Sequence, residues 1–319
     1  MKIHRTIGLC ANFLSTILVA SSALFADEEP TPYVVILGIA QDAGYPQAGC
    51  DKQCCASAWE DLKARKFASS IAIVSPNSGK RYLIDCTPDF RDQLRLLDQK
   101  SPLRPRAAGK LDGIFLTHAH IGHYAGLIHL GREVMGAKEV SVFAMPRMAA
   151  FLSSNGPWSQ LVDLQQIKLE RIAAAEPVRL DDNLSVVPFL VPHRDEFSET
   201  VGFHIRHSER SIVYLPDIDQ WHRWDVAIET IIAGCDVALL DGTFFGQGEL
   251  PGRDMSKIPH PLIQQSIERF RSLPSSQRRK IRFIHLNHSN PALKTESREY
   301  QQVVAAGMQI ATQGSRIEL

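Results

Sequence analysis

Short apolar runs rich in β-branched residues recur along the chain and alternate with longer segments of mixed polarity. Their length and composition are typical of buried strands. We expect strands at 33–39, 70–75, 81–86, 113–118, 139–145, 183–191, 200–207, 211–217, 237–245 and 281–288. The longer segments predict helices at 89–99, 124–136, 261–273 and 297–307.

Several of the predicted strands follow one another without an intervening helix, so the chain is not a simple series of strand–helix–strand units. Sheets that pack together with helices on the outside fit this order better. No repeat, low-complexity tract or linker divides the region. We therefore expect one α+β domain over residues 27–319.

The N-terminal segment differs from the rest of the chain. A basic start is followed by an apolar stretch of small residues and then by the polar sequence DEEPTP. This pattern predicts a signal peptide over residues 1–26, with cleavage after Ala23 or Ala26, and hence an exported, periplasmic or extracellular protein. An uncleaved N-terminal anchor is the alternative, whereas cleavage would leave no stable membrane span.

Composition favours a soluble globular protein, with 44% hydrophobic and 22% charged residues. Lys+Arg and Asp+Glu both number 35, and no basic stripe is visible. Nucleic acid is therefore not indicated as a partner.

The cysteines that remain after cleavage are odd in number: Cys50, Cys54, Cys55, Cys86 and Cys235. An odd number argues against a fully paired disulfide framework, even in an oxidising compartment. Three of them fall within GCDKQCC. This clustering suits metal binding, and a disulfide or free thiols are the alternative.

Three histidines, His118, His120 and His123, lie in the sequence LTHAHIGHYAGL. The apolar run before them predicts a strand that ends at His118, and a helix is expected to begin near His123. Neutral imidazole is the commonest metal ligand. Three protein ligands and a water make an open catalytic site, so the cluster predicts a metal centre.

The sequence T-H-x-H-x-x-H after an apolar strand resembles the metallo-β-lactamase superfamily, whose motif is H-x-H-x-D-H. Further matches follow in the expected order, at LIDCTPD, VPH, IVYLPDID and FIHLNHSNP. The resemblance implies an αββα sandwich in a single domain. It also implies that Asp85 supports the histidine loop, that His193 and His285 are metal ligands, and that Asp217 bridges two metal ions, with Asp219 as the fallback.

Within the superfamily, ILGIAQDAGYPQAGCDKQCC and IHLNHSNP resemble pyrroloquinoline-quinone biosynthesis protein B-like and carbon–phosphorus-lyase-associated phosphodiesterase-like proteins. This resemblance implies a structural zinc held by Cys50, Cys54, Cys55 and His288. Thiolates and an imidazole also make a chemically sensible closed zinc site. The spacing here is C-x-x-x-C-C instead of C-x-C-x-x-C.

Gly122 stands where the superfamily motif has an aspartate. The resemblance leaves His118, His120, His193 and Asp217 for a first metal ion, and only His123, His285 and Asp217 for a second. Either the second ion binds weakly, or another oxygen ligand replaces the missing carboxylate, and Asp42 is the candidate. A third reading is that Gly122 eases a tight turn.

The chemistry expected for such a site is hydrolysis of a phosphodiester or another ester in a small-molecule substrate, by attack of metal-bound hydroxide. Asp217 would orient the hydroxide. His260, at an expected helix start, would act as general acid, and Asp241 would orient it. The alternative is that neither residue has a role in catalysis.

Two other functions compete with this hydrolase. One is an iron-dependent oxidative enzyme resembling pyrroloquinoline-quinone biosynthesis protein B, because histidine and carboxylate ligands accept iron or manganese as well as one or two zinc ions. The other is a non-catalytic, metal-stabilised binding protein with a degenerate motif.

Overall fold

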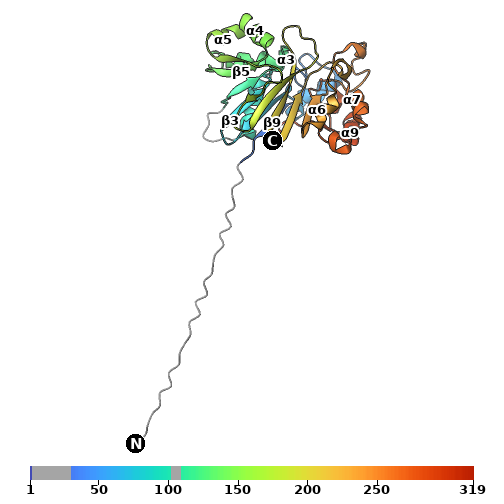
Figure 1. Cartoon of the computed structure of the whole chain (residues 1–319). Coiled ribbons are helices and arrows are strands. Elements are labelled where there is room, and N and C mark those ends of the chain that lie inside the picture. The colour runs from blue at the N-terminus through green and yellow to red at the C-terminus, as the bar shows by residue number, and fades with distance from the viewer. Residues whose placement is uncertain (2–29, 102–108) are drawn as a thin grey trace.

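The computed structural model describes residues 1, 30–101 and 109–319, and these form two sheets packed face to face (Figure 1). The first sheet has the strand order β14-β1-β2-β3-β4-β5-β6. Its strands are β1 Tyr33–Gly38, β2 Ser70–Ser75, β3 Lys80–Ile84, β4 Gly113–Phe115, β5 Val140–Ala144, β6 Ile167–Arg171 and β14 Arg316–Glu318. The second sheet has the order β13-β12-β11-β10-β9-β8-β7. Its strands are β7 Val178–Arg179, β8 Leu184–Leu190, β9 Val201–His207, β10 Arg210–Leu215, β11 Val237–Asp241, β12 Ile281–Ile284 and β13 Gln309–Ile310.

Helices cover the outer faces of both sheets. The described helices are α1 Gln53–Glu60, α2 Phe90–Lys100, α3 Ile121–Tyr124, α4 Pro146–Ser154, α5 Trp158–Asp163, α6 Ile228–Ala233, α7 Ile263–Phe270, α8 Ser275–Arg278 and α9 Arg298–Ala305. In Figure 1, α4 and α5 lie beside β5, while α6, α7 and α9 lie on the side of the second sheet. The layers are therefore helix, sheet, sheet, helix, which confirms the expected αββα sandwich in one domain.

Alternation of side chains along the strands builds this layering. In β1, Val34 and Ile36 belong to the core between the sheets, whereas Val35 and Leu37 belong to the core beneath the outer helices. Both faces of the strand are buried, so its sequence is a continuous apolar run and not an alternating one.

The site lies where strands of both sheets end. In each sheet, neighbouring strands run parallel in one half, β3 to β6 and β10 to β13, so their carboxyl ends meet at one edge. A bridge between Ala40 and Leu286 joins the loop after β1 to the end of β12. This bridge ties the two sheets together at that edge.

The helix expected over 124–136 is the clearest error of the sequence analysis. The structure has the four-residue α3, then a 3₁₀ segment at Ala125–Leu130 and turns. A Cβ atom at Gly126 would lie 2.1 Å from the carbonyl oxygen of Thr87. The segment packs too closely against the loop after β3 for a regular α-helix with larger side chains. The strand expected to end at His118 also ends earlier, at Phe115.

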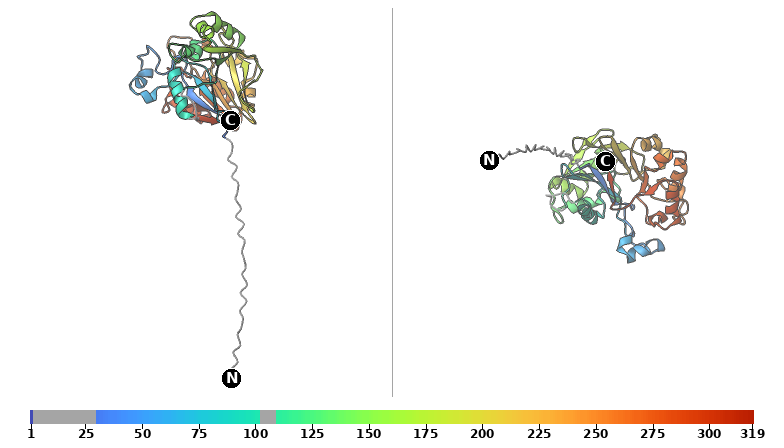
Figure 2. Two further views of the ribbon diagram at one scale, coloured as in Figure 1. Left: turned by 90° about the vertical axis from the view of Figure 1, so that its left-hand side faces the viewer. Right: turned by 90° about the horizontal axis from the view of Figure 1, so that it is seen from below.

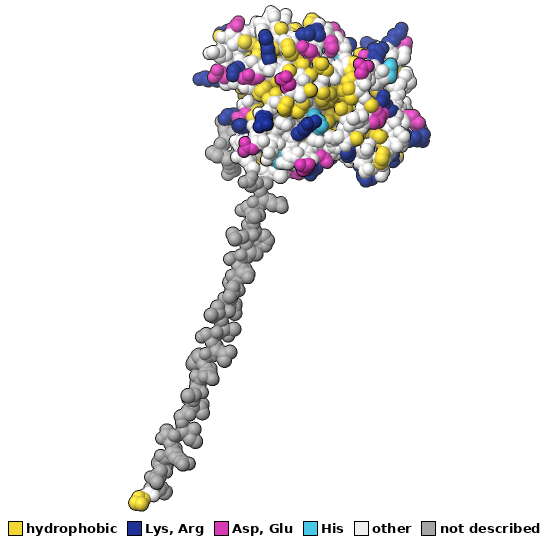
Figure 3. Space-filling view, in the orientation of Figure 1, with side chains coloured by type: hydrophobic (Ala, Val, Ile, Leu, Met, Phe, Trp, Pro, Cys, Tyr) yellow, Lys and Arg dark blue, Asp and Glu magenta, His cyan; other side chains and the backbone are white. Residues whose placement is uncertain are grey.

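The segment around α1 projects from the body of the sandwich and is the blue excursion in Figure 2. On the face drawn in Figure 3, basic and acidic side chains are interspersed around the rim, and hydrophobic side chains gather near the centre. Within the described ranges, no helix is long and apolar enough to cross a bilayer. Apart from Met1, the signal peptide expected at 1–26 lies outside the described residues.

The packing between the sheets gives a first test. Phe203 of β9 is fully buried and meets the ring of Phe115 edge-on, with 5.6 Å between centroids. We predict that Phe203→Ala lowers the free energy of unfolding by about 3–5 kcal/mol, because it leaves a cavity between the sheets. Urea-induced unfolding measures this change. Phe197→Ala is the control, since that ring is 60% exposed, and an equal loss in both variants would contradict the predicted core.

Candidate metal centre

A first group of donor atoms gathers at the sheet edge from both halves of the sandwich. His118 and His120 follow β4, His193 follows β8, and Asp217 follows β10. One donor atom from each of these side chains lies within 4.8 Å of all the others. These four residues are spread over about a hundred positions of the sequence, and the packing of the two sheets brings them together.

The carboxylate of Asp217 lies between several imidazoles. Its Oδ2 is 3.3 Å from Nε2 of His118 and 3.9 Å from Nε2 of His123. Its Oδ1 is 3.3 Å from Nε2 of His193 and 3.2 Å from Nδ1 of His260. This position fits the bridging role expected for Asp217. Asp219, the fallback, lies outside the group and pairs with Arg223 at 2.8 Å.

A second group consists of Asp42, His123 and His285, whose donor atoms also lie within 4.8 Å of one another. Oδ1 of Asp42 is 3.3 Å from Nε2 of His123 and 3.7 Å from Nε2 of His285. Burial works against the charge of Asp42, but the two imidazoles hold the pKa of that carboxyl well below its usual range. The group therefore presents an ionised oxygen and two ring nitrogens to one point.

Atoms without hydrogen-bond partners test whether these groups fit a metal ion. In the described part of the chain, six buried donor or acceptor atoms of the two groups make no hydrogen bond: Asp42 Oδ1, His123 Nε2, His193 Nδ1, His193 Nε2, Asp217 Oδ1 and His285 Nε2. Unsatisfied buried polar atoms are uncommon in native proteins and call for an explanation. Imidazole nitrogens and carboxylate oxygens are the ligands of zinc, so the residues fit one or two such ions.

Two threonines, which the sequence analysis missed, connect the buried carboxylates to the imidazoles. Thr117 donates its hydroxyl to Oδ1 of Asp85 at 2.8 Å and lies 3.0 Å from Nδ1 of His118. The carboxylate of Asp85 can only accept, so the threonine oxygen is left to accept from the ring. Asp85 also lies 2.7 Å from Nδ1 of His123. These contacts place a proton on each Nδ1 and leave Nε2 as the metal-facing nitrogen, as second-sphere partners commonly do.

The second sheet repeats this arrangement. Thr243 donates to Oδ1 of Asp241 at 2.7 Å and lies 2.9 Å from Nδ1 of His285. The sequence signal for both threonines is their place beside the functional residues, in LTH and LDGT. The role of their hydroxyls is recognisable only in the folded structure, where the strand ends bring them beside the histidines.

His260 lies beside the first group, three residues before α7. Its Nδ1 is 2.9 Å from Oδ2 of Asp241, and the ring is buried. Burial disfavours the charged ring, but the carboxylates of Asp241 and Asp217 outweigh it and raise the pKa of His260 to about 9. The pairing of His260 with Asp241 is present as the sequence analysis expected.

The loop after β8 contacts the histidine cluster from the open side. Glu196 lies 3.1 Å from Nε2 of His120, and the hydroxyl of Ser198 accepts from the backbone N–H of Ala119 at 2.8 Å. Nothing in the sequence pattern singles out these two residues. Both hold the histidine loop, Ser198 from a buried position and Glu196 from an exposed one.

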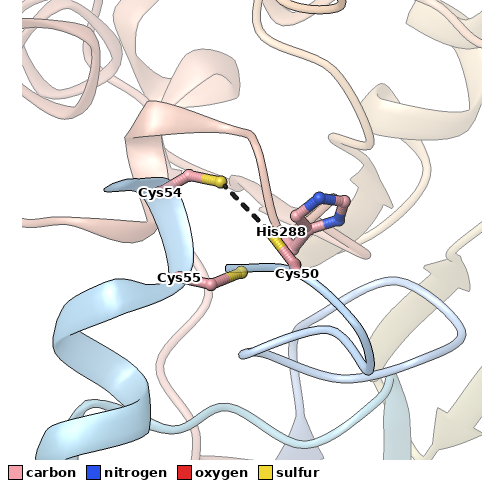
Figure 4. Close-up of side chains that lie close together, drawn as sticks. All are labelled: Cys50, Cys54, Cys55 and His288. Atoms are coloured by element: carbon pink, nitrogen blue, oxygen red, sulfur yellow. Dashed lines mark hydrogen bonds between the residues drawn. The ribbon is translucent and has the colours of Figure 1, made fainter. Parts of the chain in front are cut away.

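The cysteines expected to bind zinc come together with His288 (Figure 4). Cys54 and Cys55 lie on α1, Cys50 lies in the loop before it, and His288 lies in the turn after β12. The sulfurs of Cys50 and Cys54 are 3.7 Å apart, and no disulfide joins them in the structure. Four candidate ligands of the types typical of a closed structural zinc site thus lie within 4.8 Å of one another.

The fold is an αββα sandwich that carries two groups of candidate metal ligands at one edge. Residues 80–316 match the family model described as the beta-lactamase superfamily domain. The chain belongs to this family, as its histidine cluster indicated.

Comparison with individual proteins gives a finer likeness. Coenzyme PQQ synthesis protein B of Methylorubrum extorquens (strain PA1) is 27% identical over 306 residues, which cover 90% of this chain and 100% of that protein. The crystal structure of Zn(2+)-bound PqqB from Methylobacterium extorquens superimposes with a TM-score of 0.74 at 26% identity, over 90% of this chain and 100% of that one. A diphosphatase from the PhnP family has a TM-score of 0.63 at 22% identity, over 91% and 98% of the two chains. The likeness to coenzyme PQQ synthesis protein B confirms the resemblance seen in the sequence, and the PhnP-family structure supports the fold.

The threonine contacts generate a prediction about metal affinity. Thr117→Val and Thr243→Val remove the hydroxyls that fix the rings of His118 and His285, with little change in volume. We expect each variant to bind zinc about 10–100-fold more weakly, in line with other losses of second-sphere partners. Competition titration with a chromogenic chelator measures the affinity.

Thr87→Val is the matched control for these variants. The Thr87 hydroxyl is also fully buried and hydrogen-bonded, to Gln93 at 2.8 Å, but it contacts no imidazole. An equal loss of affinity in this control would show that the threonines act only through general stability.

The cysteine cluster generates a second prediction. Cys54→Ala should remove about one zinc ion per chain, because a structural site needs its four ligands, and it should lower the melting temperature. Elemental analysis and thermal unfolding measure the two effects. Cys235→Ala, which alters a buried cysteine outside the cluster, should keep the zinc content of the wild type. Unchanged zinc in Cys54→Ala would contradict the assignment.

Proposed function

We propose that the protein is a metal-dependent hydrolase that cleaves a phosphodiester or another ester of a small molecule, and that it acts after export. The contact between His260 and Asp241 beside the donor groups carries this proposal. Asp217, Asp241 and His260 form a further group of possible ligands. We assign His260 to proton transfer instead, because a buried imidazole that a carboxylate orients beside the other ligand groups is the arrangement that a leaving group needs as a proton donor.

The roles of the side chains follow from their contacts. Nδ1 of His260 donates to Asp241, which fixes the ring. The other ring nitrogen, Nε2, would give its proton to a departing alkoxide. Asp241 also accepts from Thr243 and from the backbone N–H of Ile218 at 3.2 Å. With its oxygens engaged in this way, Asp241 acts as a fixed anchor and does not itself move.

Zinc bound by the two groups would supply a Lewis acid that polarises the scissile bond and makes water more acidic. The chain itself contributes Asp217, whose Oδ1 makes no hydrogen bond in the described residues and lies 3.2 Å from Nδ1 of His260. As a carboxylate that stays ionised, Asp217 would orient the attacking water. Attack and departure would then be served by two groups that lie side by side.

Solved structures of related fold are consistent with this reaction class. Besides the PhnP-family diphosphatase, they include human tRNase Z, with a TM-score of 0.54, and yeast PDE1, with 0.56. Their identities to this chain are 15% and 12%. At this level they support the fold, and the reaction class rests on His260 and Asp241.

A second candidate function is an iron-dependent oxidative step of the kind that the likeness to coenzyme PQQ synthesis protein B suggests. The observation that favours it is the extent of the match, which spans the whole of that relative. Groups of three histidines and a carboxylate accept iron as well as zinc. Export weighs against it, because a cofactor pathway in the cytoplasm would keep its precursor elsewhere.

One experiment separates these candidates. The protein is purified without its leader, its metal content is measured, and it is offered bis(p-nitrophenyl) phosphate and p-nitrophenyl acetate. We predict zinc and hydrolysis of at least the phosphodiester. We further predict that His260→Gln lowers kcat about 10²–10⁴-fold, the usual contribution of a general acid, without changing the zinc content.

His204→Gln is the control for this variant, because His204 lies on β9 outside the donor groups and contacts Arg206 instead. Full activity in His260→Gln would remove its assigned role. Stoichiometric iron without hydrolysis would favour the oxidative candidate, and zinc without hydrolysis of any ester would refute the proposed function.

A further inference from the structure

Gly122 and Asp42 compete for one volume. A Cβ atom built on Gly122 would lie 2.3 Å from both Cα and Oδ1 of Asp42, and 2.6 Å from its Cβ. Real side chains do not approach so closely. A side chain at position 122 and the observed position of Asp42 therefore exclude each other.

Backbone conformation does not account for the glycine. Gly122 lies within α3 and is absent from the glycines of positive φ. Any L-residue could adopt its backbone angles, so the tight-turn reading of the sequence has no support at this position. Space is what requires the glycine, and Asp42 fills that space.

The loop after β1 delivers Asp42 to this place with little freedom. The N–H of Gln41 donates to the carbonyl of Leu286 at 2.8 Å, and Ala40 forms bridges with both Ala68 and Leu286. Leu286 directly follows His285. The pairing of Ala40 with Leu286 therefore connects the sheets and also places Asp42 beside His285. Oδ1 of Asp42 is buried and makes no hydrogen bond within the described residues.

We propose that Asp42 supplies the carboxylate ligand of the second metal ion in place of the aspartate that the family motif carries at position 122. In this chain the carboxylate comes from the loop after β1 instead of from the histidine loop, and the absence of a side chain at Gly122 leaves room for it. The second site is then Asp42, His123 and His285, with Asp217 shared with the first site. This assignment rests on the proposed hydrolase, and it predicts a second ion held by these four side chains.

The test is a transposition of the carboxylate. The variants are Asp42→Asn, Gly122→Asp, and the double variant Asp42→Gly with Gly122→Asp. Bound zinc is counted by elemental analysis after equilibration against a buffered zinc concentration, and folding is followed by thermal unfolding. Asp225→Asn, which alters an exposed aspartate outside the ligand groups, is the control.

Asp42→Asn keeps the shape of the side chain and should lose about one zinc ion per chain, since a neutral amide is a poor ligand for zinc. Gly122→Asp should lose the same ion and unfold at a lower temperature, because two side chains then claim one volume. The double variant removes the side chain of Asp42 but keeps the Cα of residue 42, which lies 2.3 Å from a Cβ at position 122. It should therefore regain the ion as the loop after β1 shifts, while its melting temperature stays below that of the wild type. Zinc regained in a less stable protein cannot come from a merely structural role for either residue.

Retention of the second ion by Asp42→Asn at wild-type affinity would overturn the assignment. A folded double variant that fails to regain the ion would overturn the equivalence of the two positions. Because zinc is counted independently of turnover, an inactive wild type that gives the predicted zinc counts would refute the proposed hydrolase and leave the assignment of Asp42 standing.

Discussion

A carboxylate buried among imidazoles is the constraint on which the site depends. Asp217 is 2% exposed, and burial opposes its charge, but His193, His260 and His285 hold the pKa of Asp217 well below its usual range. An ionised group at this depth must be compensated, because an unpaired buried charge is expensive. The imidazoles can compensate it only if protons or a cation stand between the rings and the carboxylate. A metal ion would do this, and buried ring nitrogens of His123, His193 and His285 make no hydrogen bond in the described residues.

The two sheets meet this constraint with the same device. In each sheet an aspartate lies at the end of a parallel strand: Asp85 directly follows β3, and Asp241 is the last residue of β11. Each aspartate accepts a hydrogen bond from a threonine hydroxyl. The oxygen of that hydroxyl lies beside Nδ1 of a histidine. The charge is thereby placed behind the ring, where it fixes the tautomer. Asp241 serves His260 in addition, whereas Asp85 serves His123. Both sheets thus orient candidate metal ligands, and the second sheet also orients His260, the proposed proton donor.

The sequence predicts the parts of this structure that local patterns determine. Buried strands such as β1 and β12 are continuous apolar runs, and the histidine spacing after β4 is specific enough to locate the metal centre. The two threonines escape notice because a hydroxyl acquires its role from partners in other strands. The helix expected at 124–136 fails for a related reason, since Gly126 reflects close packing against Thr87 and not local preference. Candidate residues were predictable where their types are chemically distinctive, and not where tertiary contacts decide.

The loop after β1 carries both Asp42 and the cysteine cluster, yet the structure separates the two. Paired backbone hydrogen bonds between Tyr45 and Lys66, at 2.7 and 2.8 Å, close the base of the projecting segment. Asp42 lies on the sheet side of this closure, and Cys50 lies beyond it. A projecting segment buries little apolar surface to offset its ordering entropy, and a bound ion at the cysteines would stabilise it. The hydrogen bonds at the base allow Asp42 to stay in register with His285 whether or not the cysteines hold metal, so the two centres can share one loop without depending on each other.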